Sequence, residues 1–405
     1  MNWLYSKWWK WVSVVLLFYI LIGGLTMPLG PGLPSVEPTL FNPDSVYTFD
    51  IYAYNTHFTD KAAGKVQVWF KNGPDYFCPI ETKVIDDEHL QAKFGVSGFT
   101  VTSPEKQEFD VVLNDDIDGN VIARAAVTVK APKAKEPVHL NDTVAHSGLY
   151  ITDAEVSSDY KLYVPDTLNK ACEPEVLHNK HTLFVFPYRE ILYETIRNTF
   201  YHVPMWFVMT MMVFVCLGAG LIYLLTGNIK WDIFASRAAL VAILFGLCGY
   251  TTGMLWSKYT WFIGIDWSHA IRKMMYEDIK LAGALVSVLT YIVYFIIRTS
   301  IQVEGTPTVD GESINTLKAK RARYSAIYSI FAVVIFILFV FIVPRLGGVD
   351  SLHPGQAGNP AFNKYDLDSH LRMFFYPAVI GWILLGFWIL SILVRMEFIK
   401  QKQES

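Results

Sequence analysis

Six long apolar stretches constrain this chain more than any other feature. A helix that crosses a bilayer needs about 20 apolar residues, because the hydrocarbon core is about 30 Å thick and each helical residue adds about 1.5 Å. Stretches that meet or nearly meet this requirement lie at residues 11–27, 205–225, 235–255, 281–297, 326–343 and 374–394. The sequence therefore predicts a polytopic α-helical membrane protein with six transmembrane helices.

The low charge of the chain agrees with this prediction. Only 18% of its residues are charged, against about a quarter in soluble proteins, and 52% are hydrophobic. The net charge of −3 gives no indication of a nucleic-acid partner.

The first apolar stretch follows Lys7 and Lys10, as the apolar part of a secretory signal peptide follows basic residues. The sequence "LLFYILIGGLTMPLGPG" lacks a small-x-small cleavage site, however. We therefore interpret residues 1–27 as an uncleaved transmembrane helix.

Lys and Arg residues predict the orientation of the helices, because short cytoplasmic loops of membrane proteins are enriched in them. They gather in four segments that lie on one side of a six-helix chain: the N-terminus with Lys7 and Lys10, the loop with Lys230 and Arg237, residues 298–323, and the tail with Arg395, Lys400 and Lys402. We therefore expect both termini in the cytoplasm. Residues 28–204, 256–280 and 344–373 are then expected on the outer side.

The long outer segment has a different composition. The stretches "DSVYTFDIYAYNTHF", "GKVQVWFKNG", "FDVVLND" and "GNVIARAAVTVKAP" alternate apolar and polar residues between turn-forming residues, which is typical of half-buried strands. We expect a β-sandwich over about 45–132, a linker at "APKAKEP" and a less regular part up to about Pro187.

The four cysteines fall into two groups. Cys78 and Cys172 lie in the outer segment, where disulfides persist, so a Cys78–Cys172 bridge is one possibility. Their Cα separation decides it, and spacing in sequence does not give this distance. Cys216 and Cys248 lie in apolar helices, where simple packing is expected. No CxxC or Cys/His spacing predicts a zinc site.

His202 stands two residues before Pro204, at the start of the second apolar stretch. One interpretation is an interfacial histidine that headgroups solvate and that has no function. The other is a ligand for haem iron, because two further histidines, His353 and His370, lie in the last outer loop. Tryptophans in the middle outer loop suit either a haem platform or the aromatic belt of a membrane protein.

Four segments follow one another along the chain: "RNTFYHVPMW", "TGMLWSKYTW", "DIKLAGALVSVLTYIVY" and "SLHPG". Together they resemble CcmC, a family of haem-handling membrane proteins of cytochrome c maturation. The segment "RNTFYHVPMW", with Arg197 and His202, is similar to the start of the family's second helix. The segment "SLHPG", with His353, is similar to its third outer loop. The resemblance covers residues 197–395, in the family's order.

The other two segments resemble the family's tryptophan-rich WWD motif. "TGMLWSKYTW" and "DIKLAGALVSVLTYIVY" carry the matching residues Thr252, Gly253, Trp256, Lys258, Trp261, Asp278 and Lys280.

The chain departs from this family in three ways. Phe262 replaces a glycine of the motif, and Trp267 is the only tryptophan between Trp261 and Asp278. The extra segment "DWSHAIRKMMYED" predicts an amphipathic helix on the membrane surface, with Trp267, Ile271 and Met274 or Met275 facing lipid or ligand. The third departure is the first outer loop, which carries an insert of roughly 150 residues whose function the resemblance does not imply.

The resemblance implies a set of functions for these residues. His202 and His353 would be axial ligands of a non-covalent haem b, with His370 as an alternative to His353 and His269 as an additional candidate. Trp256, Trp261 and Trp267 would cover the macrocycle. Lys258, Lys280 and Arg197 would pair with the propionates. Asp278 would orient Lys280 or an indole, or help to dock a partner. Its position just before "IKLAGALVSVL" independently predicts a helix N-cap, and the two functions are compatible.

The resemblance also implies the protein's place in the cell. It would lie in the bacterial inner membrane, present haem at the outer face to a periplasmic chaperone of the CcmE type, and work with an ABC transporter of the CcmAB type. It would not be an enzyme. Two alternatives are a haem lyase or synthetase component of the CcmF or CcsA type, and a receptor or transporter with a ligand-binding β-domain.

These expectations divide the chain into four parts. They are an N-terminal transmembrane helix (1–27), an extracytoplasmic β-rich insert (28–196), a five-helix membrane domain with the outer loops (197–398) and a cytoplasmic tail (399–405).

Overall fold

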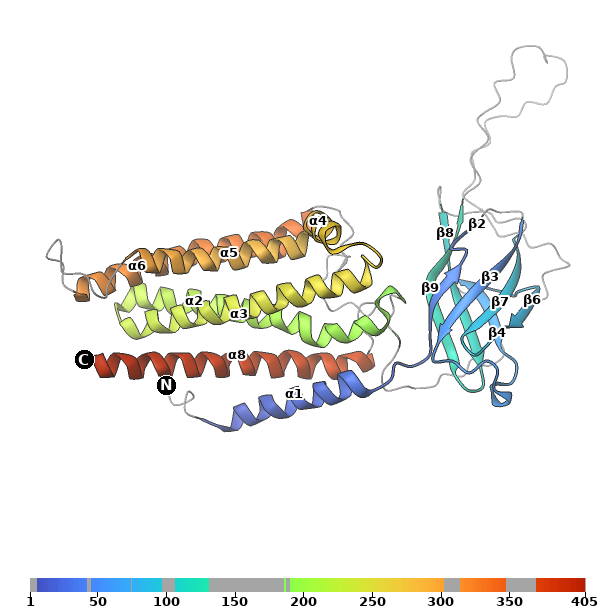
Figure 1. Ribbon diagram of the computed structural model, residues 1–405, viewed down its shortest axis with the longest axis horizontal. Coiled ribbons are helices and arrows are strands. Elements are labelled where there is room, and N and C mark those ends of the chain that lie inside the picture. The colour runs from blue at the N-terminus through green and yellow to red at the C-terminus, as the bar shows by residue number, and fades with distance from the viewer. Residues whose placement is uncertain are drawn as a thin grey trace, which may run out of the picture. The chain divides into compact units, whose positions relative to one another are not determined.

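The computed structural model describes residues 6–41, 45–73, 75–96, 106–130, 186, 190–301, 314–346 and 369–404 (Figure 1). The chain forms two compact units. One unit consists of Met1–Pro28 and Glu194–Ser405, and the other of Leu29–Tyr193.

The first unit is a helical bundle. Its long helices are α1 (Trp8–Thr26), α2 (Thr199–Thr226), α3 (Ile229–Thr260), α5 (Ile279–Ser300), α6 (Ile314–Ile337) and α8 (Ser369–Glu404). A π-helical segment (Leu338–Ile342) extends α6 into the short α7 (Val343–Leu346), and α4 (Trp267–Glu277) precedes α5. Six helices in the described part of the chain are long and apolar enough to cross a membrane, which confirms the predicted number.

Each of the six long helices begins before the apolar stretch predicted for it. The helix α2 begins at Thr199, six residues before the stretch that starts at Met205. Hydropathy misses these residues because they include polar side chains that find partners within the protein.

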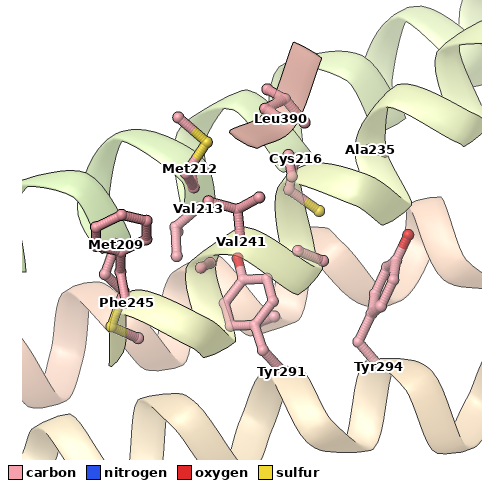
Figure 2. Packing of buried hydrophobic residues seen from close by; sticks show 14 of the residues in the cluster. Met209, Met212, Val213, Cys216, Ala235, Val241, Phe245, Tyr291, Tyr294 and Leu390 are labelled. Atoms are coloured by element: carbon pink, nitrogen blue, oxygen red, sulfur yellow. The ribbon is translucent and has the colours of Figure 1, made fainter. Parts of the chain in front are cut away.

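Methionine, alanine and aromatic side chains form the core of the bundle. Its fully buried members come from five helices, and they include Met209 and Val213 on α2, Ala238 on α3, Tyr291 on α5, Phe336 on α6 and Leu390 on α8. Figure 2 shows part of this cluster. The side chain of Ser13 on α1 donates a hydrogen bond to the carbonyl of Gly381 on α8.

A buried ion pair joins α3 to α5. The two guanidinium nitrogens Nη1 and Nη2 of Arg298 lie 2.5 and 2.9 Å from the two carboxylate oxygens of Asp232. Asp232 lies in the first turn of α3 and Arg298 in the last turn of α5, so each charge also opposes the dipole of its own helix end. Both side chains are almost completely buried.

The second unit is a sandwich of two sheets. One sheet has the order β1–β3–β7–β6, with strands Gly32–Glu37, Ser45–Tyr54, His89–Val96 and Glu81–Val84. The other has the order β2–β9–β8–β4–β5, with strands Leu40–Phe41, Gly119–Lys130, Lys106–Asp115, Gln67–Asn72 and Asp75–Phe77. All pairings are antiparallel except that of β2 with β9.

Aromatic rings from both sheets fill the interior of the sandwich. Phe49 and Phe94 come from the first sheet and Phe70 and Phe109 from the second, and all four are buried. The rings of Phe70 and Phe94 stack with centroids 3.7 Å apart. This core confirms the prediction of a β-rich unit with alternating buried residues.

The sandwich begins earlier than expected. Strands β1 and β2 precede residue 45, where the predicted sandwich starts. The predicted linker and the less regular part after it lie outside the described residues, apart from Phe186. Cys78 is disulfide-bonded, and Cys172, the other cysteine of the outer segment, lies outside the described residues.

Candidate functional site

His202 lies inside the bundle and not at its surface. It stands in the first turn of α2, and its side chain is completely buried. Pro204 also lies within this helix.

Both ring nitrogens of His202 have hydrogen-bonding partners. The indole Nε1 of Trp206 donates to Nε2 of His202 at 3.2 Å, and Nδ1 lies 3.1 Å from Oγ1 of Thr252. An indole N–H only donates, so Nε2 accepts, and Nδ1 carries the proton of a neutral ring. The Thr252 hydroxyl then donates to the carbonyl of Cys248 at 2.7 Å. This chain of hydrogen bonds assigns one tautomer to His202.

Two glycines on α3 make room for these side chains. A Cβ atom at Gly253 would lie 2.6 Å from Cε1 of His202, and one at Gly249 would lie 3.0 Å from Cε2 of Trp206. The glycines are four residues apart, and so are His202 and Trp206, so each pair lies on one face of its helix. Small residues at this spacing allow transmembrane helices to approach closely.

Trp256 continues this contact toward the end of α3. Its ring meets that of His202 edge to face, with centroids 5.5 Å apart, and lies 6.1 Å from that of Trp261. Its indole nitrogen donates to Oγ1 of Thr195 at 3.2 Å, and Thr260 bonds the same oxygen at 2.9 Å. The end of α3 is thereby tied to Thr195, which precedes α2 in the same unit.

Trp267 lies apart from this group. It is the first residue of α4, is exposed, and meets the ring of Tyr259 at 6.5 Å. The ammonium nitrogen of Lys258 lies 5.8 Å from the Trp267 ring centroid. The structure therefore brings His202, Trp256 and Trp261 together and pairs Trp267 with Lys258.

The three predicted propionate partners differ in their surroundings. Arg197 pairs with Glu194 and donates to the carbonyl of Gly24 at 2.8 Å, which links the start of α2 to α1. Lys258 donates to the carbonyl of Phe262 at 3.0 Å. Lys280 is half-buried in the first turn of α5.

Asp278 caps a helix, as one of its two expected functions requires. It is buried, and its Oδ1 accepts a hydrogen bond from the backbone N–H of Leu281 at 3.0 Å, at the start of α5. A carboxylate at this position also interacts favourably with the helix dipole.

The predicted surface segment forms the helix α4. Ala270 and Met274 are its buried residues, and they pack against Phe262 and Leu281, whereas Ile271 is exposed. Met274 therefore faces the protein interior.

His269 lies on the outside of α4. Its side chain is 63% exposed and pairs with Asp266, which caps the helix.

The last outer loop is only partly described. His353 lies outside the described residues. His370 lies in the first turn of α8, half-buried. Phe374, one turn further, packs against Phe200 of α2 with ring centroids 6.0 Å apart, so His370 lies at the same end of the bundle as His202. The described ranges contain no group of three or more His, Cys, Asp or Glu residues arranged to hold a metal ion.

Sequence reasoning missed the partners of His202. Trp206 and Thr252 both lie within segments that resemble the CcmC family, but the resemblance implies no function for either residue. Two signals could have found them, namely the four-residue spacing of His202 and Trp206 and the "GYTTG" run at 249–253.

No protein-family model matches this chain, and no curated protein matches it either.

The site can accept haem iron only after a local change. An imidazole binds iron through an unprotonated nitrogen, which here is Nε2 of His202. Trp206 already donates to this nitrogen, and the ring has no exposed surface. Haem ligation by His202 therefore requires the Trp206 side chain to move.

Proposed function

We propose that this protein binds haem at the outer face of the bacterial inner membrane and presents it to a periplasmic haem chaperone of the CcmE type. One observation carries the proposal. His202, from the first segment that resembles the CcmC family, packs directly against Gly253 and Trp256 from the second. Residues about 50 positions apart thus form one contact group at one end of an apolar bundle.

The hydrogen bond at Nδ1 of His202 supports the proposed function of this residue as a ligand. The donation from Nδ1 to Thr252 holds the ring in one orientation and leaves Nε2 as the nitrogen with a lone pair. A partner that accepts the second N–H of a ligating histidine also raises the basicity of the ligating nitrogen. His353 supplies the second imidazole in this proposal, with His370 as the alternative.

The aromatic and charged residues have separate functions in this proposal. Trp256 and Trp261 cover the macrocycle beside His202, and Trp267 and Lys258 extend this surface toward α4. Lys258, Lys280 and Arg197 provide positive charge for the two propionates. Haem is a cargo here, so the protein transfers it and carries out no bond chemistry on it.

The absorption spectrum of the purified protein tests this proposal. We expect a Soret band of non-covalent haem, since the chain has no CxxCH for covalent attachment. The double variant His202→Ala and His353→Ala should lose the band and still insert into the membrane. His269→Ala is the matched control, because His269 is exposed and paired with Asp266. A double variant that keeps its spectrum would disprove the assignment of the two ligands.

The β-sandwich acts as a docking module for the chaperone and the CcmAB-type transporter in this proposal. Its own aromatic core and its separation as a compact unit support this function. A variant in which a short linker replaces Leu29–Tyr193 keeps Thr195 and Arg197, which contact the bundle. We expect it to retain haem and to lose cytochrome c maturation. Loss of haem from a correctly inserted variant would instead assign the sandwich to the haem site.

A further inference from the structure

The strand β6 leaves one edge of its sheet open. It ends the order β1–β3–β7–β6 and pairs with β7 alone in the described part of the chain (Figure 1). The other three edge strands of the sandwich are less able to add a strand, because β1 contains Pro34 and because β2 and β5 have only two and three residues. The strand β6 has neither protection, so its backbone can pair with a further strand.

Alternate backbone groups of β6 face this open edge. The backbone N–H of Ile85, directly after the strand, donates to the carbonyl of His89 on β7 at 2.9 Å. Successive residues of a strand direct their backbone groups to opposite sides, so those of Thr82 and Val84 face away from β7. These groups can bond a strand that is added at the edge.

Apolar side chains at this edge remain exposed. Val84 lies opposite Leu90 of β7, which is buried in the core of the sandwich, so both side chains lie on the inner face of the sheet. Val84 itself is 36% exposed, and Ile80, just before the strand, is 49% exposed. A strand added beside β6 would cover apolar surface that the sandwich leaves open.

The sequence of β6 is complementary to itself when two copies run antiparallel. In "IETKV", residues 80–84, an acidic and a basic residue flank Thr82, and an aliphatic residue lies outside each of them. With the two Thr82 residues opposite each other, Glu81 of each copy lies opposite Lys83 of the other. Ile80 of each copy then lies beside Val84 of the other. A pair centred on Glu81 or on Lys83 would instead place like charges opposite each other, which is unfavourable.

We propose that β6 pairs with β6 of a second copy of this chain, in an antiparallel and two-fold symmetric contact centred on Thr82. The contact joins the two four-stranded sheets into one continuous sheet. The same surface serves both copies, so the assembly closes as a dimer. Strands of four residues make a small interface, below about 1,000 Å², which is typical of weak association. The contact uses residues of the sandwich alone and is independent of haem binding.

Charge reversal tests this pairing through a mixture of two variants. Lys83→Glu leaves a copy with acidic residues on both sides of Thr82, and Glu81→Lys leaves a copy with basic residues on both sides. Each variant should associate with itself about tenfold more weakly than the wild type, because both opposite-charge pairs become like-charge pairs. A mixture of the two variants should recover the wild-type association, since every acidic residue then faces a basic one. Mixing would not repair a folding defect in either variant.

Energy transfer between full-length copies in lipid vesicles measures the association. Donor and acceptor fluorophores at the C-termini report it over a series of protein-to-lipid ratios. Lys61→Glu is the matched control, because Lys61 is an exposed lysine of the sandwich outside β6, and this variant should associate as the wild type does. The proposal is overturned if wild-type copies show only the transfer of random encounters. It is also overturned if the mixture associates no better than either variant alone.

Discussion

The indole nitrogen of Trp206 lies 3.2 Å from Nε2 of His202, one turn away on the same helix. Iron ligation and this hydrogen bond require the same lone pair, so the two exclude each other. If the protein binds haem as proposed, Trp206 would compete with the iron for this nitrogen and favour release of the haem.

The variant Trp206→Phe tests this competition. It removes the N–H donor and keeps an aromatic ring, so Nε2 becomes available to iron. We expect haem to bind about fivefold more tightly, which corresponds to one lost hydrogen bond of about 1 kcal/mol. Titration of the purified protein with haemin, followed at the Soret band, measures the affinity. Trp382→Phe, elsewhere in the bundle, is the control, and equal affinities in both variants and the wild type would refute the competition.

Gly253→Ala should disrupt the packing of His202. The added Cβ would lie 2.6 Å from Cε1 of the imidazole and 3.3 Å from Cδ1 of Leu281. Overpacking costs about 1–3 kcal/mol, and the gain in helix propensity offsets about 1 kcal/mol of it. Gly218→Ala has no neighbour within 4 Å and should be neutral or stabilising. Thermal unfolding of both variants in detergent checks the expected order, and a Gly253→Ala protein as stable as Gly218→Ala would show that the ring can move freely.

Asp232→Asn should destabilise the bundle strongly. It leaves the buried guanidinium of Arg298 without its carboxylate, and removing one member of a buried pair costs about 3–5 kcal/mol. Glu397→Gln breaks the more exposed pair of Glu397 with Arg237 and should cost about 1 kcal/mol or less. Chemical unfolding measures the free energy of unfolding of both variants. Equal losses of this free energy in the two variants would contradict the importance of burial.

The β-sandwich should lose stability as the pH rises above neutral. The Nδ1–H of His57 donates to Oδ1 of Asp118 at 2.9 Å, and its backbone N–H donates to Oδ2 at 2.7 Å. The side-chain hydrogen bond with Asp118 raises the pKa of His57, and the charges of Asp118, Asp87 and Asp60 act in the same direction. Because the folded pKa exceeds the unfolded value of about 6.5, the stabilisation is complete below that pH and disappears as the pH rises through the folded pKa.

Hydrogen exchange of the sandwich between pH 6 and pH 8 measures this effect once the intrinsic rates are corrected. In His57→Gln the pH dependence of the protection should be flatter than in the wild type. Burial raises the pKa of Asp115 as well, so the comparison with His57→Gln, and not the pH profile of the wild type alone, identifies the contribution of His57. An unaltered pH profile in the His57→Gln protein would rule out His57 as the group responsible.

Cysteine labelling in intact cells checks the predicted orientation. In a Cys248→Ser background, Ser268→Cys on α4 should react with a membrane-impermeant maleimide from outside. Ala319→Cys on α6 should react only after lysis, because the Lys and Arg residues near it predict a cytoplasmic position. Both positions are exposed in the structure. Labelling of Ala319→Cys from outside and of Ser268→Cys only after lysis would show that the orientation is the opposite of the predicted one.

Features that depend on local sequence were predictable. Six helices follow from apolar length, since a helix satisfies its backbone hydrogen bonds internally and needs only a composition that suits its surroundings. The N-cap Asp278 follows from its position before an apolar run. The strands β3, β4, β8 and β9 follow from the alternation of their residues. The strands β2, β5, β6 and β7 are not individually predicted by this pattern, and neither is β1. That strand contains Pro34 and lies at the edge of its sheet, where proline is tolerated but where a sequence pattern argues against a strand.

The environment of His202 was decided by the tertiary structure alone. Its sequence predicts an imidazole near the membrane surface, and the structure instead buries it in the first turn of α2. Its tautomer depends on Thr252, 50 residues away, and its depth depends on Gly253, which lets α3 approach α2. Length and hydropathy are sums over neighbours in the chain, whereas hydrogen-bond partners and close helix contacts depend on which faces of two helices meet.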